Sequence, residues 1–258
     1  MSIENQYGLF LRLRRHLVQL LECLENPYPM NKRVEHAFNG SIKFADCYVT
    51  RQLLERHKPK TCLEIGSFLG FSTRWLLESG KGWGMRVTAV DPNMRHRIFD
   101  NPRWMVEGIN AAFYPEYLEI ISGFFGSQAG PPWYHGYENF LPRRDKEWTQ
   151  RYLSDRVLLD GRWGRCFDCI YIDAVHSYQA VMDGFRCALP LLSPDGFIIF
   201  HDALTWEGVK QVLTELQQEF SGKAEVSILD GSTVYEHPHL EQEPSRVADG
   251  IGFFKPFG

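Results

Sequence analysis

Residues 61–77 constrain the fold more than any other part of the chain. They read Thr-Cys-Leu-Glu-Ile-Gly-Ser-Phe-Leu-Gly-Phe-Ser-Thr-Arg-Trp-Leu-Leu, an apolar strand that turns at Gly66 and Gly70 and continues into an amphipathic helix. Glycines at such a turn allow the backbone to approach a nucleotide-type ligand at the carboxyl end of a parallel strand. The segment therefore predicts an α/β fold with a parallel sheet and a ligand site at one edge of that sheet.

Glu64, two residues before Gly66, indicates the charge of that ligand. Loops that bind a pyrophosphate use the pattern G-x-G-x-x-G, and an acid at this position would repel the phosphates. An acid is favourable for a cationic ligand, and S-adenosylmethionine carries a sulfonium and an ammonium group. We therefore expect this segment to bind S-adenosylmethionine. The candidate contacts are Glu64, Gly66, Ser67, Gly70 and Ser72.

Three further apolar segments, 85–91, 164–173 and 196–202, also end in acids. Carboxyl ends of parallel strands meet at the same edge of a sheet, so these acids are expected to share one polar site. Asp91 ends the second strand, where a carboxylate binds the ribose hydroxyls in folds that hold nucleosides at a sheet edge. Asp173 ends a later strand and is a candidate both for cofactor binding and for catalysis.

These segments resemble class I S-adenosylmethionine-dependent methyltransferases, in the subgroup called methyltransferase family 24. That subgroup is similar to macrocin-type sugar O-methyltransferases and, more distantly, to catechol O-methyltransferase. The resemblance rests on residues 63–73, 90–92, 167–178 and 189–202, and it covers about residues 40 to 256. It implies a Rossmann-like, doubly wound and mostly parallel sheet of about seven strands. It also implies methyl transfer to a small-molecule acceptor, more often at oxygen than at nitrogen.

The resemblance further implies how the acceptor oxygen is activated. In metal-dependent relatives, magnesium is held by an acid at the position of Asp173 and by two oxygen ligands at the positions of His201 and Asp202. His201 departs from this pattern, because an imidazole shifts the preference from magnesium toward manganese, iron or zinc. The alternative is metal-free catalysis in which His176 or His201 is the base and titrates near neutral pH. Asp173 is central to either mechanism.

The adenine contacts are expected after the third strand, near residues 118–122. The family commonly has a polar or acidic residue there, but residues 122–127 contain no acid. Either Ser127 or a backbone N–H replaces the acid, or Phe124 or Phe125 stacks on the base.

The chain is expected to consist of an N-terminal helical extension, residues 1–40, and a methyltransferase domain, residues 41–258. A stripe of leucines at helical spacing from Leu9 to Leu24 covers either the sheet domain or a second subunit, which would make a homo-oligomer. Residues 30–40 are expected to be a loop.

Residues 127–163 are too long for an ordinary connection and too aromatic for a disordered linker. We expect them to form a cap over the acceptor pocket, although the same aromatics could pack a local core or a dimer contact. The last two strands, near 224–229 and 250–255, are expected to form an antiparallel hairpin.

Composition argues against several classes of partner. The 28 basic and 32 acidic residues are mixed along the chain and give a net charge of −4, so no nucleic-acid partner is expected. No apolar run approaches the roughly 20 residues of a membrane-spanning helix, and the N-terminus lacks a signal-type segment, which favours the cytoplasm. Cys166 and Cys169 begin a strand and face opposite sides, so we expect buried small hydrophobes rather than a redox or zinc pair.

Two other functions stay open at this stage. A Rossmann-type oxidoreductase with a nicotinamide cofactor is disfavoured by Glu64 and by the missing third glycine. A non-catalytic binding module on the same fold is favoured by the missing adenine acid and by His201. His237 and His239 are expected to belong to a solvated loop rather than to a metal site.

Overall fold

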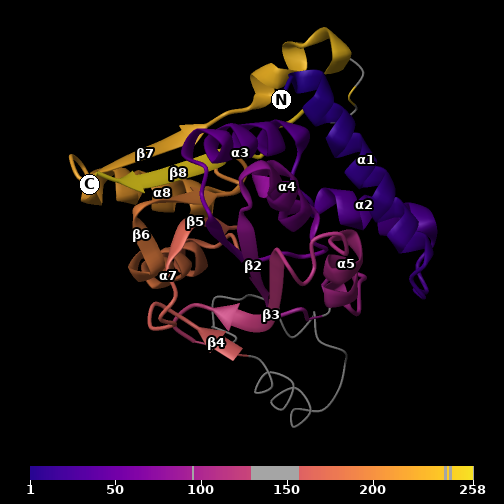
Figure 1. Ribbon diagram of the computed structural model, residues 1–258, viewed down its shortest axis with the longest axis horizontal. Coiled ribbons are helices and arrows are strands. Elements are labelled where there is room, and N and C mark those ends of the chain that lie inside the picture. The colour runs from indigo at the N-terminus through magenta and orange to yellow at the C-terminus, as the bar shows by residue number, and fades with distance from the viewer. Residues whose placement is uncertain (95, 129–156, 241–242, 244–245, 258) are drawn as a thin grey trace.

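The computed structural model describes residues 1–94, 96–128, 157–240, 243 and 246–257. Most of the expected cap, residues 129–156, therefore lies outside the described residues. Within the described ranges the chain forms an eight-stranded sheet with helices on both faces (Figure 1). The predicted α/β fold with a mostly parallel sheet is confirmed.

The strand order of the sheet is β4-β3-β2-β1-β5-β6-β8-β7. The strands are β1 (Thr61–Ile65), β2 (Arg86–Asp91), β3 (Leu118–Phe125), β4 (Val157–Leu159), β5 (Phe167–Ile172), β6 (Leu192–Phe200), β7 (Ala224–Leu229) and β8 (Ile251–Pro256). Neighbours from β4 to β6 are parallel, whereas β8 is antiparallel to both β6 and β7, as the expected hairpin requires. The strand order reverses between β1 and β5, and ligands of such sheets bind outside the carboxyl ends at this point.

The sheet has one strand more than the sequence predicts. The additional strand is β4, which pairs in parallel with the last residues of β3, from Gly123 to Phe125. β4 lies within the segment expected to be a cap, and its three residues, Val-Leu-Leu, are too few to show a periodic pattern.

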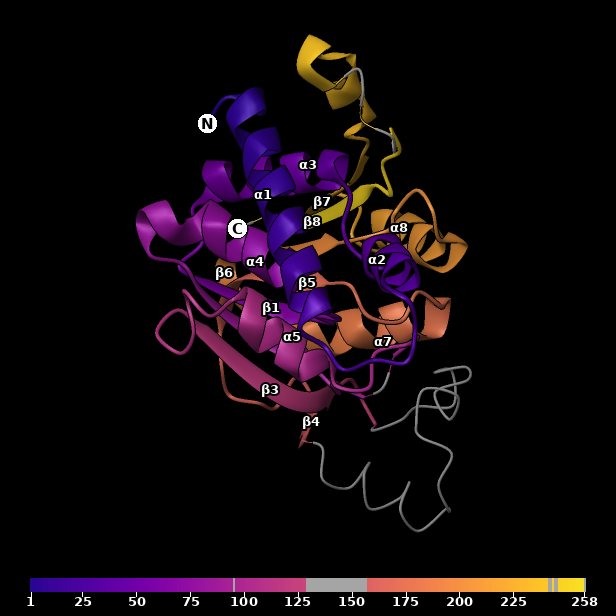
Figure 2. The same ribbon diagram turned by 90° about the vertical axis from the view of Figure 1, so that its right-hand side faces the viewer.

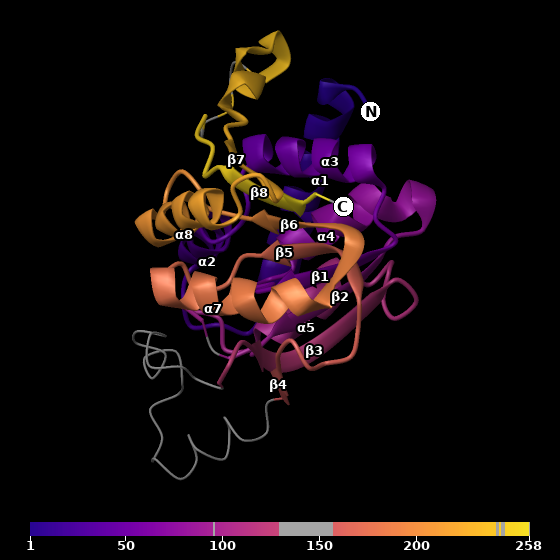
Figure 3. The same cartoon turned by 90° about the vertical axis from the view of Figure 1, so that its left-hand side faces the viewer.

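Helices cover the two faces of the sheet. They are α1 (Ile3–Glu22), α2 (Met30–Asn39), α3 (Phe44–His57), α4 (Phe71–Gly80), α5 (Pro102–Ile109), α7 (Tyr178–Ala188) and α8 (Glu207–Glu219). Short 3-10 helices occur at Lys81–Trp83, Leu189–Leu191, Ser232–Glu236 and Pro238–Leu240. Figure 2 shows α1, α4 and α5 on one face, and Figure 3 shows α7 and α8 on the opposite face. Each face packs its own apolar core against the sheet.

Residues 30–40 form the helix α2 rather than the predicted loop. Met30, Val34, Ala37 and Phe38 recur at helical spacing and pack on the core, so these residues do carry the apolar periodicity of a helix and the loop prediction is wrong. Arg33 donates to the carbonyl oxygens of Leu21 and Leu24 at 2.6 and 3.0 Å, which satisfies carbonyls at the end of α1. The interaction between α1 and α2 is therefore tertiary, and the local sequence pattern does not reveal it.

The leucine stripe of α1 packs within the chain. Leu9, Leu13 and Leu17 are buried, Leu20 and Leu24 are partly buried, and α1 contacts α3, α4 and α5. A homo-oligomer through the N-terminal helix stays a prediction.

Cys169 is buried in β5, as expected, but Cys166 precedes the strand and is exposed. The prediction of a buried small hydrophobe is therefore right for Cys169 and wrong for Cys166. No helix in the described part of the chain is long and apolar enough to cross a membrane.

Candidate active site

Gly66 brings the carboxyl ends of β1 and β5 together. Its φ is +91°, and a Cβ at this position would lie 2.0 Å from the backbone oxygen of Asp173. The backbone N–H of Asp173 donates to the Ile65 oxygen at 2.8 Å. Gly70, with a φ of +81°, precedes α4 where a Cβ would lie 2.8 Å from Val106 Cα. Both glycines of the predicted loop are thus required by backbone conformation and close approach.

Asp91 holds the loop that follows β1. One carboxylate oxygen accepts from the backbone N–H groups of Ser67 and Phe68 at 2.9 and 3.1 Å, and the other accepts from the Asn93 N–H at 2.7 Å. Burial raises the pKa of Asp91, and the three N–H groups oppose this shift. The predicted ribose ligand therefore also fixes the shape of the glycine loop.

A cavity lies at the carboxyl ends of β1, β2, β3 and β5 and reaches α7. Of the predicted site residues, Gly66, Asp91 and Asp173 line it, and so do Phe124 and Phe125. Its described lining also contains the acid Asp183 and contains no lysine or arginine. The described lining does not include Glu64, Ser67, Gly70, Ser72, His176, His201, Asp202 or Ser127.

Glu64 faces α4 instead of the cavity. Residues alternate along β1, so Leu63 and Ile65 pack toward α7 and α8 while Glu64 points to the other face. There the hydroxyls of Ser72 and Thr73 donate to its two carboxylate oxygens, the first at 2.6 Å. Burial raises the pKa of Glu64 to about 8, although both hydroxyls oppose this shift. Glu64 and Ser72 therefore pair with each other beneath the loop.

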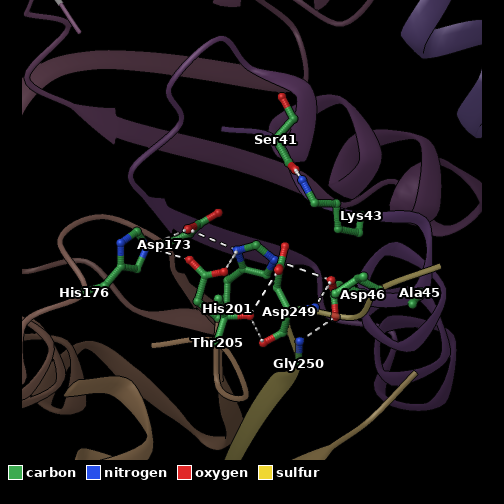
Figure 4. Close-up of polar contacts among 12 residues, drawn as sticks. Ser41, Lys43, Ala45, Asp46, Asp173, His176, His201, Thr205, Asp249 and Gly250 are labelled. Carbon is green, nitrogen blue, oxygen red and sulfur yellow. Dashed lines mark hydrogen bonds and ion pairs between the residues drawn. The ribbon is translucent and has the colours of Figure 1, made fainter. Parts of the chain in front are cut away.

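Two histidines and two acids meet after β5 and β6, and Figure 4 shows Asp173, His176 and His201 of this cluster. His201 Nδ1 lies 3.2 Å from Asp173 Oδ1 and 3.6 Å from Asp202 Oδ1. His176 Nε2 lies 2.8 Å from Asp202 Oδ2 and 3.5 Å from Asp173 Oδ1. The four residues predicted for catalysis and metal binding are thus brought together. Trp206 stacks on His176 with 5.0 Å between ring centroids, and its side chain is 51% exposed.

The histidines and acids of this cluster shift one another's pKa. Burial would lower the pKa of His176, but Asp173 and Asp202 raise it to about 9. Burial likewise opposes the shift of His201, whose pKa Asp173 raises well above its ordinary value. Burial would raise the pKa of Asp173, but His201 and His176 hold it below its usual range. Both shifts favour the protonated form of the imidazoles, and the histidine base that titrates near neutral pH stays a prediction.

Asp46 also belongs to this cluster, although the sequence pattern does not predict it. Asp46 is fully buried in the first turn of α3, and its Oδ2 lies 3.8 Å from His201 Nε2. Its carboxylate also accepts from the backbone N–H groups of Asp249 and Gly250 at 2.9 and 2.8 Å. The signal in the sequence is an acid between two small apolar residues, Ala45 and Cys47, at the start of α3.

The donor atoms of Asp173, His201 and Asp202 fit a divalent metal ion. One ligand atom from each residue lies within 4.8 Å of the others. His201 is 5% exposed, and neither of its ring nitrogens has a hydrogen bond of good geometry. A set of one imidazole nitrogen and two carboxylate oxygens suits manganese, iron or zinc better than magnesium, which prefers oxygen ligands. His237 does not belong to this donor set, and its Nε2 lies 3.2 Å from Glu4 Oε1.

Comparisons with known proteins agree with this fold. The model of methyltransferase family 24, described as a methyltransferase domain, matches residues 63–203. An O-methyltransferase from Bacillus cereus in complex with SAH is 15% identical with a TM-score of 0.55, covering 95% of this chain and 91% of its own. An SAH-bound methyltransferase from Podospora anserina is 14% identical with a TM-score of 0.54, and the match covers 95% of this chain and 88% of that protein's chain. A methyltransferase from Geobacter sulfurreducens is 13% identical with a TM-score of 0.52, covering 93% and 95%. No curated protein matches the chain significantly.

Proposed function

The chain belongs to methyltransferase family 24, and we propose that it transfers the methyl group of S-adenosylmethionine to a hydroxyl oxygen of a small-molecule acceptor. The observation that carries this proposal is the position of Asp173. This residue lines the cavity and also contacts His176 and His201. A donor bound in the cavity would therefore lie next to the titratable cluster, as a transfer reaction requires.

The charge of the cavity supports S-adenosylmethionine as the donor. Its described lining has three acids, Asp91, Asp173 and Asp183, and neither lysine nor arginine. Such a lining favours a ligand with a sulfonium and an ammonium group. It disfavours a nicotinamide dinucleotide, because a pyrophosphate would lie near carboxylates without a basic side chain to offset them. Asp91 would bind the ribose hydroxyls through the lone pairs that the backbone N–H groups leave free.

The chemistry makes unequal demands on the two substrates. The sulfonium donor leaves as a neutral thioether and needs no acid, whereas a neutral hydroxyl is a poor nucleophile and must lose its proton. The proton can pass to a carboxylate of the cluster, Asp173 or Asp202, and on to water, while the imidazolium groups of His176 and His201 stabilise negative charge on the acceptor oxygen. A divalent cation held by Asp173, His201 and Asp202 would supply the same stabilisation as a Lewis acid. The exposed face of Trp206 offers an apolar surface for a planar or aliphatic part of the acceptor.

Calorimetry with two ligands tests the proposed donor. The full chain should bind S-adenosylhomocysteine and show no measurable binding of NAD at the same concentration. Transfer of labelled methyl from S-adenosylmethionine should then be measured on a panel of phenols, sugars and aliphatic alcohols. Binding of NAD instead of S-adenosylhomocysteine would refute the proposed function. Binding of S-adenosylhomocysteine without transfer to any acceptor in the panel would favour a non-catalytic module.

A further inference from the structure

The structure supplies an acid at the end of the cavity where the sequence offers none. Asp91, at the tip of β2, marks the ribose position, and the next strand outward in the sheet is β3. Residues 123–125 at the end of β3 line the cavity, so the base of a bound nucleoside would lie over them. The side chains that line the cavity opposite these residues therefore decide which base is accepted.

One face of α7 forms that side of the cavity. Ala180, Asp183 and Gly184 are three and four residues apart, lie on the same helical face and all line the cavity. Gly184 is buried, yet a Cβ built on it would meet nothing within 4 Å. A buried helical glycine beside open space leaves room for a flat group that a side chain would otherwise fill. Asp183 is the acid at the edge of this room.

The residues after β3 hold Asp183 in place. The backbone N–H of Ser127 donates to Asp183 Oδ2 at 2.8 Å. A Cβ on Gly126, whose φ is +149°, would lie 2.6 Å from the same oxygen, so only a glycine allows this approach. Asp183 Oδ1 has no hydrogen-bond donor among the described residues. The carboxylate is thus anchored through one oxygen, and the other can accept a hydrogen bond from a ligand.

We propose that Asp183 accepts a hydrogen bond from the 6-amino group of the adenine of S-adenosylmethionine and so selects adenine over 6-oxopurines. This inference rests on the proposed function and names a specificity-determining residue of its donor site. Adenine presents an N–H donor at position 6, whereas hypoxanthine and guanine present a carbonyl oxygen there. A carbonyl oxygen facing a fixed carboxylate leaves both acceptors without a donor, which a binding site strongly rejects. Asp183 would perform the role for which Ser127 was one of the predicted candidates, and the backbone N–H of Ser127 holds Asp183 in place.

The test compares S-adenosylhomocysteine with S-inosylhomocysteine, which differs by a 6-oxo group in place of the 6-amino group. Calorimetry on the full chain should show at least about 10-fold tighter binding of the adenosyl compound by the wild type. Asp183→Asn keeps the acceptor for the Ser127 N–H but presents an NH₂ to the ligand, so the preference should disappear or reverse. Asp195→Asn, at an exposed position of β6 that does not line the cavity, is the control and should keep the wild-type ratio.

Gly184→Ala provides a second test that does not depend on a charge change. Alanine favours the interior of a helix over glycine, and its Cβ would enter open space, so the melting temperature should rise or stay constant. Affinity for S-adenosylhomocysteine should nevertheless fall about 10-fold or more, because the methyl group occupies the place of the base. An unchanged ratio of the two ligands in Asp183→Asn, or unchanged affinity in Gly184→Ala, would overturn the inference. Failure of the wild type to bind either ligand would instead overturn the proposed function.

Discussion

His201 directs its Nε2 atom toward the carboxylate of Asp46, with 3.8 Å between Nε2 and Oδ2. The opposite nitrogen, Nδ1, faces Asp173 at 3.2 Å. At this distance the carboxylate acts on the ring through charge rather than through a hydrogen bond, and it favours the orientation in which the other nitrogen faces Asp173. Asp46 is fully buried and anchored on the loop before β8, so it is a rigid support. We therefore assign Asp46 as a positioning residue for His201.

Asp46→Asn should lower turnover by about 10- to 100-fold and lower affinity for Mn²⁺ by a similar factor, because His201 loses its orienting charge. S-adenosylhomocysteine affinity should stay within a few-fold, since Asp46 does not line the cavity. Asp168→Asn is the matched control, because Asp168 also accepts two backbone N–H groups, at 2.7 and 3.1 Å, but at the amino end of β5. Equal loss of turnover in both variants would show a merely structural effect.

Asp173→Asn should separate binding from catalysis. The substitution keeps the shape of the side chain and removes the charge that fixes His176 and His201, so turnover should fall by about 100-fold or more. Affinity for S-adenosylhomocysteine should survive within a few-fold. Single-turnover kinetics at saturating donor measures the first quantity, and calorimetry measures the second. A variant with full activity on the true acceptor would remove Asp173 from the mechanism.

The sequence predicts the acids at the strand ends because chain direction alone places them. Asp91, Asp173 and Asp202 each follow an apolar segment, and parallel strands bring such positions to one edge of the sheet. Glu64 also belongs to a strand, but its side chain turns to the opposite face because strand residues alternate. A local motif therefore locates the loop around Gly66 correctly and still does not decide which face of the sheet a neighbouring side chain reaches.

Other parts of the site depend on contacts between distant segments. Asp183 meets Ser127 across 56 positions, and Asp46 meets Gly250 across 204. No periodic pattern or short motif records such pairs, because each residue fits its own helix equally well whether or not it faces a ligand. The helix α2 is a different case, because Met30, Val34, Ala37 and Phe38 follow a local helical spacing that contradicts the predicted loop.

Asp91→Ala should weaken the binding of S-adenosylhomocysteine for two reasons. It removes the acceptor for the ribose hydroxyls, and it releases the N–H groups of Ser67 and Phe68 that hold the glycine loop. Charge-assisted hydrogen bonds contribute about 1.5–3 kcal/mol each, so the affinity should fall by at least about 10-fold. Calorimetry measures this loss, and Asp195→Ala at an exposed position of β6 should show none. Wild-type affinity in Asp91→Ala would exclude it as a ribose ligand.

Glu64→Gln should change the pH dependence of stability. Burial raises the pKa of Glu64 in the folded chain to about 8 from an ordinary value of 4.5, so the folded state favours the neutral acid. The contribution of neutral Glu64 to the free energy of unfolding is therefore fully present below about pH 4.5 and is lost as the pH rises through about 8. Between these limits the free energy of unfolding should fall by up to about 1.4 kcal/mol per pH unit. Glutamine stays neutral, so the variant should lack this slope.

Urea unfolding at pH 5 and pH 8.5 measures the free energy of unfolding of the wild type and of Glu64→Gln, and hence the difference between them at each pH. Relative to wild type, the variant should be more stable at pH 8.5 than at pH 5. This holds even if the amide of glutamine pairs less well with the hydroxyls of Ser72 and Thr73 and lowers the stability by the same amount at both pH values. Glu116→Gln, which changes an exposed glutamate, should follow the wild-type curve. If the difference in free energy of unfolding between wild type and Glu64→Gln were the same at both pH values, Glu64 would have an ordinary pKa in the folded chain. The acid beneath the loop would then be ionised at neutral pH, and its charge would reach the donor site as the sequence motif first indicated.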